Sequence, residues 1–313
     1  MCRRDAILLC VRGSTTGRTN RADQPYAIGR GVAAIEAEDL DDQSYLYYAL
    51  LARLGRLLER TTGSVFPNLS QADVGSLLVP WLPPDSRRAI AEVLGALDDK
   101  IDANQRTVAL LREVASTLYR QGVQEEPDVE TVGDVATFHN RLRVPLSSRD
   151  RSTRPGPFAY HGAAGVLDHV DSYLFGGIYL LVGEDGTVIS NDRHPMLQYV
   201  WGKFWVSNHA HVLTGSRIST ELLRVALGSV DITAVVTGAV QPKLSMGNLK
   251  AVALTLPMRR EMLEVRLAEL AAHERSLGAE HRLLTRTRDA LLPKLLSGDV
   301  RVRDAEDLVG EAV

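Results

Sequence analysis

The stretch Gly63-Ser-Val-Phe-Pro-Asn-Leu-Ser70 recurs 175 positions later as Gly238-Ala-Val-Gln-Pro-Lys-Leu-Ser245, with glycine, valine, proline, leucine and serine in step. An apolar stretch that ends in a proline follows each copy, at residues 77–80 and 251–257. A long helical pattern begins after each proline. Because internal repeats indicate a duplicated architecture, we expect a globular segment and a long helix to occur twice.

The first helical pattern carries apolar residues at alternating spacings of four and three, a heptad seam typical of a helix paired with another helix. Pro84 and Asp85 supply its start signal. The alternative is an amphipathic helix that packs only on its own domain, but a narrow stripe sustained over several heptads favours the helix pair. The predicted seam runs through Ile90, Leu94, Leu97, Ile101, Asn104, Val108 and Leu111.

The second helical pattern places a leucine at every seventh residue, at Leu263, Leu270, Leu277, Leu284 and Leu291. Its other seam position is mixed and includes Glu274, His281 and Arg288. Polar residues in a seam cost stability but fix its register, so we expect these three to meet polar groups such as Asn104.

These patterns predict an α+β fold with two α/β domains, the first one partial, and two long helices. Residues 178–182 and 187–189 are interpreted as the two strands of a hairpin. The expected segments are a partial first domain (1–83), a long helix (84–122), a linker (123–134), a second domain (135–257), a second long helix (258–297) and an acidic tail (298–313).

Composition narrows the class of protein. A length of 313 residues suits about two domains. Cys2 and Cys10 are the only cysteines, so no disulfide framework or zinc knuckle is expected, and a reducing cytoplasm is the expected compartment. The formal net charge of −3 argues mildly against DNA binding, but the segment from Arg141 to Arg154 holds five arginines and a single acid.

Several motifs, in order and partly in duplicate, resemble the specificity subunits of type I restriction-modification systems. Residues 63–73, Val79-Pro80 and Ile90-Ala-Glu-Val-Leu-Gly-Ala-Leu-Asp-Asp-Lys-Ile-Asp102 are similar to the central conserved region of that family. A target recognition domain is suggested by Phe158-Ala-Tyr-His-Gly-Ala-Ala-Gly165, Tyr173-Leu-Phe175, Tyr179-Leu-Leu-Val-Gly-Glu-Asp-Gly186 and Trp205-Val-Ser-Asn-His-Ala-His-Val212. The resemblance covers nearly the whole chain.

The resemblance implies a DNA reader without an active site of its own. Two target recognition domains would each read half of a split double-stranded DNA target, separated by the two helices packed antiparallel as a coiled coil. The helices would dock modification subunits that methylate adenine, and motor-nuclease subunits would join the complex. No cofactor is expected on this chain, because S-adenosylmethionine, ATP and Mg²⁺ belong to the partner subunits.

One departure from the family pattern concerns the first domain. Residues 6–13 align best with residues 179–186, so the counterpart of residues 135–178 is missing in front. The first recognition domain is therefore expected to lack its opening third, either because the true start lies upstream or because the subunit is truncated. Half-length members of the family work by pairing with a second copy. The alternative function is a scaffold that binds modification subunits without specific DNA reading.

Arginine holds phosphates and reads guanine edges, so the arginine-rich segment is the leading DNA-contact candidate, against the alternative of a solvated loop. Tyr160 and His161 either contact DNA or pack a turn, and His209 and His211 are expected on one side of a strand. The repeated turn, with Asn68, Ser70 and Ser245, is expected to organise the passage from domain to helix. The predicted contacts are Arg12, Thr15, Arg18, Arg141, Arg143, Arg149, Arg151, Arg154, Tyr160, His161, Asn208, His209, His211 and Lys243.

Enzyme and metal signatures fail on inspection. Asp98 and Lys100 match a loose nuclease pattern, but they lie within the heptad helix, where residues two apart do not share a face. The segment Leu82-Pro-Pro-Asp85 has the wrong neighbours for an amino-methyltransferase motif. His209 and His211 have too few further ligands nearby for a metal site. No catalytic residue and no metal is therefore predicted.

Overall fold

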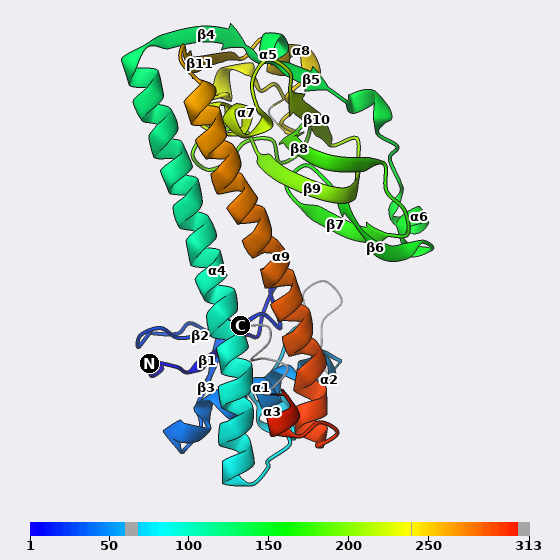
Figure 1. The fold of residues 1–313 in the computed structure, drawn as a ribbon. Helices are drawn as coiled ribbons and strands as arrows, with labels where there is room; N and C mark the ends of the chain where they lie inside the picture. Colours follow the sequence, from blue (N-terminus) through cyan, green and yellow to red (C-terminus); the bar gives the residue numbers. More distant parts are fainter. Residues whose placement is uncertain (60–67, 239, 306–313) are drawn as a thin grey trace. The chain divides into compact units, whose positions relative to one another are not determined.

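The computed structural model describes residues 1–59, 68–238 and 240–305, which belong to two compact units. The first unit consists of Met1–Arg106 and Gly278–Val313, and the second of Thr107–Leu277. Two long helices, α4 (Pro84–Glu125) and α9 (Glu261–Ser297), contribute to both units (Figure 1). Residues 63–67 of the first repeat and the tail beyond residue 305 lie outside the described residues.

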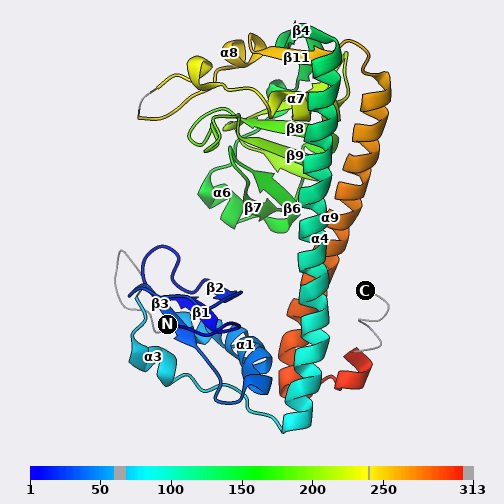
Figure 2. The ribbon, with the colours of Figure 1, turned by 90° about the vertical axis from the view of Figure 1, so that its left-hand side faces the viewer.

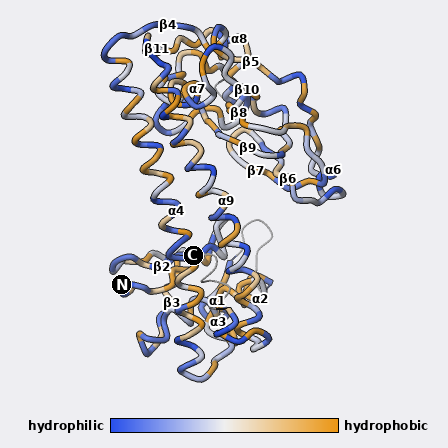
Figure 3. The backbone as a smooth tube through the Cα atoms, viewed as in Figure 1, coloured by the Kyte–Doolittle hydropathy of each residue, from blue (hydrophilic) through white to orange (hydrophobic). Residues whose placement is uncertain are grey.

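The mixed fold and both long helices are confirmed. Figure 3 shows the tube of α4 alternating between hydrophobic and hydrophilic stretches, as expected for a helix with one buried stripe. Ion pairs establish that the helices are antiparallel. In the first unit Asp98 Oδ1 lies 2.7 Å from Arg288 Nη1, and in the second Glu274 Oε1 lies 2.6 Å from Arg112 Nη2.

The first unit contains a small antiparallel sheet with strand order β2-β1-β3. Tyr45, Tyr48 and Ala49 pack against the first half of α4 and the end of α9, together with Leu94, Leu97, Leu284 and Leu291. Tyr48 also donates a hydrogen bond from its hydroxyl to Asp98, 2.7 Å away. The elements are β1 (Ile7–Cys10), β2 (Thr19–Arg21), β3 (Val32–Ile35), α1 (Gln43–Leu51), α2 (Leu54–Leu58) and α3 (Gln71–Gly75), with a 3₁₀ turn at Leu40–Asp42.

The second unit is built on a six-stranded sheet with order β5-β10-β8-β9-β6-β7 (Figure 1). Its strands are β5 (Ala136–Phe138), β6 (Pro155–His161), β7 (Val166–Val170), β8 (Phe175–Gly183), β9 (Leu197–Val206) and β10 (Ala210–Gly215). A separate pair joins β4 (Pro127–Thr131) to β11 (Ala253–Pro257). The helices are α5 (Val132–Val135), α6 (Ser148–Ser152), α7 (Thr220–Leu227) and α8 (Met246–Lys250), with 3₁₀ turns at Asn140–Leu142 and Thr233–Val235.

The second half of the central strand β8 is buried on both faces, which explains its apolar run Leu180-Leu-Val182. Leu180 and Val182 face a core that includes α7, Tyr119 of α4 and Leu267 of α9. Leu181, between them in sequence, faces a second core containing Phe175 and Phe204 on the opposite side. In Figure 2, α7 lies on the side of the sheet nearest to α4 and α9.

Glu274 is the polar position of the α9 seam in the second unit. Glu274 is 4% exposed, and its carboxylate accepts hydrogen bonds from Arg112 of α4 and Arg224 of α7. Burial alone would raise the pKa of Glu274, but the bonds and charges of Arg224 and Arg112 hold that pKa below its ordinary value. The carboxylate therefore stays ionised and ties three helices together.

Two expectations differ from the structure. Residues 178–182 do form a strand, but β8 pairs with β9 and β10 rather than with residues 187–189, because the long β9 offers eight register partners. Residues 123–134, expected as a linker, contain the end of α4, all of β4 and the start of α5. One acid there is held by two arginines, since Glu130 binds Arg217 and Arg260, whereas Glu125, Glu126, Asp128 and Asp134 are exposed.

Two adjacent leucines of α9 offer a matched test of the helix seam. Leu284 is completely buried and Leu283 is 59% exposed. We expect Leu284→Ala to lower the free energy of unfolding by about 3 kcal/mol, because it leaves a cavity in the seam. Leu283→Ala should change it by less than about 0.5 kcal/mol. Urea unfolding followed by circular dichroism at 222 nm measures both, and equal effects would contradict the assigned seam.

Candidate nucleic-acid interface

The arginine-rich segment of the second unit is folded rather than looped. It contains the 3₁₀ turn at Asn140–Leu142 and the short helix α6. Ser147 caps α6: its side-chain oxygen accepts a hydrogen bond from the backbone N–H of Asp150, and the Asp150 carboxylate accepts one from the backbone N–H of Ser147. This capping box is a strong local helix start, and it replaces the loop that the sequence was expected to form.

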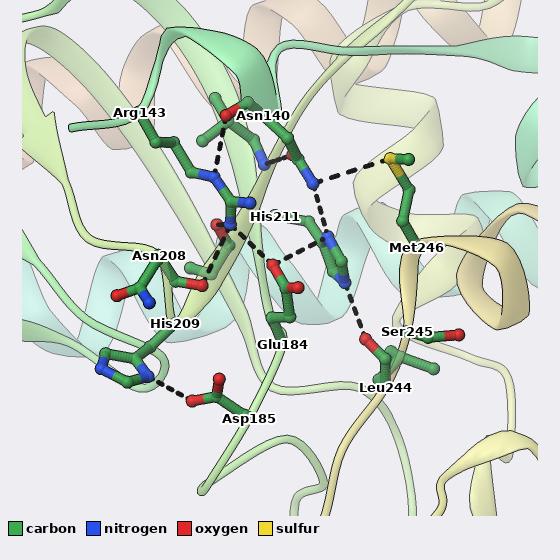
Figure 4. A network of polar contacts seen from close by, with 12 residues as sticks. Asn140, Arg143, Glu184, Asp185, Asn208, His209, His211, Leu244, Ser245 and Met246 are labelled. Atoms are coloured by element: carbon green, nitrogen blue, oxygen red, sulfur yellow. Dashed lines mark hydrogen bonds and ion pairs between the residues drawn. The ribbon is translucent and has the colours of Figure 1, made fainter. Parts of the chain in front are cut away.

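Arg143 points into the unit instead of toward solvent (Figure 4). Its Nη1 donates to Glu184 Oε2 at 2.6 Å, to the carbonyl of Ala210 at 2.6 Å and to the carbonyl of Asn208 at 3.2 Å. Its Nε donates to the carbonyl of Asn140 at 3.0 Å. The guanidinium group of Arg143 therefore binds acceptors of the protein itself.

Two further arginines of the segment also have protein partners. Arg151 pairs with Asp168 and lies over the ring of Tyr160. Arg154 pairs with Asp171 and lies over the indole of Trp205. These contacts hold α6 and its flanks against β6, β7 and β9 of the sheet.

Arg141 and Arg149 differ from the other three. Both are exposed, and within residues 1–59, 68–238 and 240–305 no side chain or backbone group pairs with their guanidinium groups. Arg149 lies in α6 and Arg141 in the preceding 3₁₀ turn. Of the predicted set of five, these are the two whose charge is available to an external anion.

Tyr160 and His161 are packed inside the second unit. Tyr160 is 1% exposed, and the hydroxyl of its side chain accepts a hydrogen bond from the backbone of Leu146 at 3.0 Å. His161 Nδ1 lies 2.9 Å from the side-chain oxygen of Gln198, and burial lowers the pKa of His161. Both side chains are buried, which agrees with the alternative that they pack a turn.

His211 is the centre of a buried polar network (Figure 4). It is completely buried on β10, with Nε2 at 2.8 Å from the carbonyl of Leu244 and Nδ1 at 2.8 Å from Asn140 Nδ2. Burial lowers the pKa of His211, and Glu184 opposes that shift only in part. The neutral ring therefore donates from Nε2 to Leu244 and accepts at Nδ1 from Asn140.

His209 does not share a face with His211, contrary to expectation. It lies in the turn before β10, its side chain is 49% exposed, and its Nδ1 contacts the carboxylate of Asp185 (Figure 4). Asn208 and Lys243 are exposed beside this turn. The strand alternation fails here because β10 begins only at Ala210.

The duplication seen in the sequence is present in the backbone of both units. The strand order β9-β8-β10 corresponds to β2-β1-β3. In the second unit Glu184 donates its backbone N–H to the carbonyl of His209, and Leu244 donates to the carbonyl of Glu184, both at 2.8 Å. In the first unit the corresponding bonds run from Val11 to Gly31 and from Leu69 to Val11, both at 2.9 Å.

The repeated serines are helix caps, which agrees with their expected role between domain and helix. Ser70 caps α3 and Ser245 caps α8, each through its side-chain oxygen. The residue two positions before each cap bridges a strand end: Asn68 pairs with Arg12, and Lys243 pairs with Asp185. Arg12 and Arg18 are exposed, and Thr15 is half-buried in the turn between them.

The positions of Arg143, His209 and His211 are fixed by polar partners that the sequence did not single out. Glu184, Asp185 and Asn140 were not singled out, although Glu184 aligns with Val11 of the first unit. The available signal was a charged residue, Glu184, at a position where the other repeat has the apolar Val11.

A cavity of about 410 Å³ in the second unit is lined by α4, α7 and α9, and three of its charged lining residues are tied up with one another, because Arg112 and Arg224 both pair with Glu274. No cluster of three His, Cys, Asp or Glu side chains is placed to hold a metal ion there or elsewhere in the described ranges. Among the same residues, no helix is long and apolar enough to cross a membrane.

Comparisons with known proteins converge on one family. A family model described as "Type I restriction modification DNA specificity domain" matches residues 3–112. A type I restriction enzyme specificity subunit of Haemophilus influenzae is 28% identical over 42% of this chain and 34% of its own length. The MjaIX specificity subunit of Methanocaldococcus jannaschii is 22% identical over 95% of this chain and 78% of its own. The match thus spans about a third of the first relative and most of the second.

The fold has a solved counterpart. The crystal structure of the S subunit of a type I restriction-modification system from M. genitalium superposes with a TM-score of 0.56 and 18% sequence identity. The superposition covers 94% of this chain and 83% of that one. This likeness concerns the fold.

The burial of His211 predicts a pH dependence of stability. Its folded-state pKa is lowered from an ordinary value of 6.5, so the unfolded chain binds the proton more readily. The contribution is complete above pH 6.5 and declines as the pH falls below that value. Urea unfolding followed by tryptophan fluorescence in a Trp81→Phe background should show this decline, and His211→Gln should make it smaller. The exposed His169→Gln is the control, and an unchanged pH slope in His211→Gln contradicts the assignment.

Proposed function

This chain belongs to the specificity subunits of type I restriction-modification systems, and we propose that it reads a two-part DNA target for partner subunits that methylate adenine and cleave DNA. In this role the chain supplies recognition and assembly surfaces, and the chemistry takes place on the partners. S-adenosylmethionine, ATP and Mg²⁺ would all be bound by those partners.

The observation that carries the proposal is the repeated backbone framework. Both units end their central strand with the same hydrogen bonds to the same two neighbouring segments. The side chains there differ: Arg12 and Asn68 in the first unit correspond to Asp185 and Lys243 in the second, and Arg12 and Lys243 are the exposed members. Two copies of one framework with different exposed groups suit the reading of two different half-sites.

Exposed cations of the second unit support contact with the DNA backbone. Arg141 and Arg149 are available to phosphates, whereas Arg143, Arg151 and Arg154 are held by protein acids. Phosphate contacts position a reader on the duplex without specifying sequence. A net charge of −3 is therefore compatible with local positive charge at Arg141 and Arg149.

Exposed apolar residues support protein partners. On α4, Leu110 is 60% and Val114 46% exposed, and on α9, Met262 is 67% and Val265 55% exposed. Leu110 and Val114 lie one helical turn apart, as do Met262 and Val265, and neighbouring exposed apolar side chains suit a protein contact. We infer that the modification subunits dock on the two helices, and that the motor-nuclease subunits join through them.

Adenine methylation mapping tests the proposed function. Genomic DNA would be compared from cells that carry the modification subunit with and without this chain. We expect a split methylated motif that disappears when the chain is absent. A methylated palindrome of one half-site would indicate that two copies of the chain pair. Unchanged methylation would contradict the proposal that the chain reads DNA and would favour the scaffold alternative.

A salt titration tests the two free arginines. In the complex with modification subunits, Arg141→Ala with Arg149→Ala should weaken binding to all DNA sequences alike. The slope of log K against log salt should become shallower by about 0.9 for each phosphate that the variant no longer neutralises. Arg259→Ala, which removes an exposed arginine paired with Glu126 elsewhere in the same unit, serves as the control. An unchanged slope would show that these two arginines do not hold phosphates.

A further inference from the structure

Three short segments form one surface of the second unit, which we name the tip: residues 184–186, 207–209 and 242–243. The backbone of Glu184 bonds to His209 and Leu244, and Gly186 donates to the carbonyl of Pro242 at 3.0 Å. The middle segment connects β9 to β10, which lie on either side of β8, so it crosses the end of β8. The tip is therefore fixed by backbone bonds between segments distant in sequence.

His209 is the tip residue with the most constrained exposed side chain. Its ring is half-exposed, and Asp185 contacts Nδ1 (Figure 4). A carboxylate only accepts hydrogen bonds, so the proton of the neutral ring lies on Nδ1 and Nε2 becomes an acceptor. An acceptor in the major groove fits the exocyclic amino group of adenine or cytosine.

Arg143 holds the turn that carries His209 through hydrogen bonds to its backbone. Its Nη1 donates to the carbonyls of Asn208 and Ala210, the residues on either side of His209. The same group is held by Glu184, which in turn approaches the buried His211 at 3.4 Å. Arg143 thus fixes the backbone on both sides of His209 while only 14% of its own side chain is exposed.

The first unit shows which parts of the tip are structural and which are variable. Gly13 and Gly186, at corresponding positions, both adopt positive φ, at 87° and 78°. The corresponding backbone bonds are kept, but Gly31 stands where the second unit has His209. The supporting network is also absent at these positions, since Val11 and Ala33 replace Glu184 and His211. The framework is constant, and the exposed groups with their supports vary between units.

We propose that the tip reads a base pair of the DNA target through His209, oriented by Asp185, and that Arg143 is a positioning residue that sets this turn without touching DNA. This inference rests on the proposed function and specifies its site in the second unit. Arg143 was expected among the DNA contacts, and here its role is indirect.

Selection from randomised double-stranded DNA by the complex of the full chain with its modification subunits tests the proposal. Sequencing of the bound fraction gives the preference at every position. We expect His209→Ala to reduce discrimination at one adenine–thymine or guanine–cytosine pair about tenfold, with the other positions unchanged. The salt dependence of binding should be unaffected, because His209 neutralises no phosphate.

Arg143→Gln distinguishes positioning from a merely structural role. It should relax the same base pair as His209→Ala, and the double variant should be no worse than either single one. Arg143→Lys, which keeps the charge near Glu184 but has no Nε donor for Asn140, should retain part of the preference and serves where Arg143→Gln folds poorly. Arg259→Ala should leave every preference intact.

The outcomes separate the two claims. A wild-type preference that survives His209→Ala at every position would overturn the tip as a reader and leave the proposed function standing. Equal weakening of all sequences by both Arg143 variants, with a lower melting temperature, would reduce Arg143 to a structural role and overturn its assignment. A wild-type complex without any sequence preference would refute the proposed function and this inference together.

Discussion

Charged side chains set into a leucine-rich helix seam are the constraint on which both units depend. Glu274 is buried and meets Arg112 and Arg224 in the second unit, and Asp98 meets Arg288 in the first. Glu274 is buried, so a slip in helix register that left its carboxylate without Arg112 would be disfavoured. Arg112 is itself 58% exposed, and Asp98 and Arg288 are partly exposed, so each pair contributes less than a fully buried ion pair would. In each unit the register of α4 against α9 is therefore set by charge as well as by shape.

The seam also carries a cost in the first unit. Asn104 Nδ2 and His281 Nδ1 are buried, and among the described residues neither has a hydrogen-bond partner. Unsatisfied buried polar atoms cost about 1–3 kcal/mol each. A seam of leucine alone would be more stable but would permit several registers, so these polar residues are consistent with a helix pair selected for one alignment rather than for maximal stability.

The sequence revealed the repeat and the helices because both are encoded locally, in motif spacing and heptad periodicity. Helix bounds came within three residues of those observed, at 84–125 and 261–297. The fate of the arginines was not encoded locally. Arg143 is drawn inward by Glu184 and by two carbonyls more than sixty positions away, and neither is visible from the composition of its own segment. The predicted hairpin was wrong for the same reason, because β8 pairs with the longer β9 rather than with residues 187–189.

Hydrogen–deuterium exchange of the intact complex, free and bound to its target duplex, tests most directly whether the tip meets DNA. We expect slower exchange at residues 184–186 and 207–209 on target DNA, beyond the protection given by an unrelated duplex. The corresponding segments around Val11 and Gly31 should also gain protection, because they share the framework. Protection confined to other surfaces, or equal on target and unrelated DNA, would contradict the assignment of these segments to sequence reading.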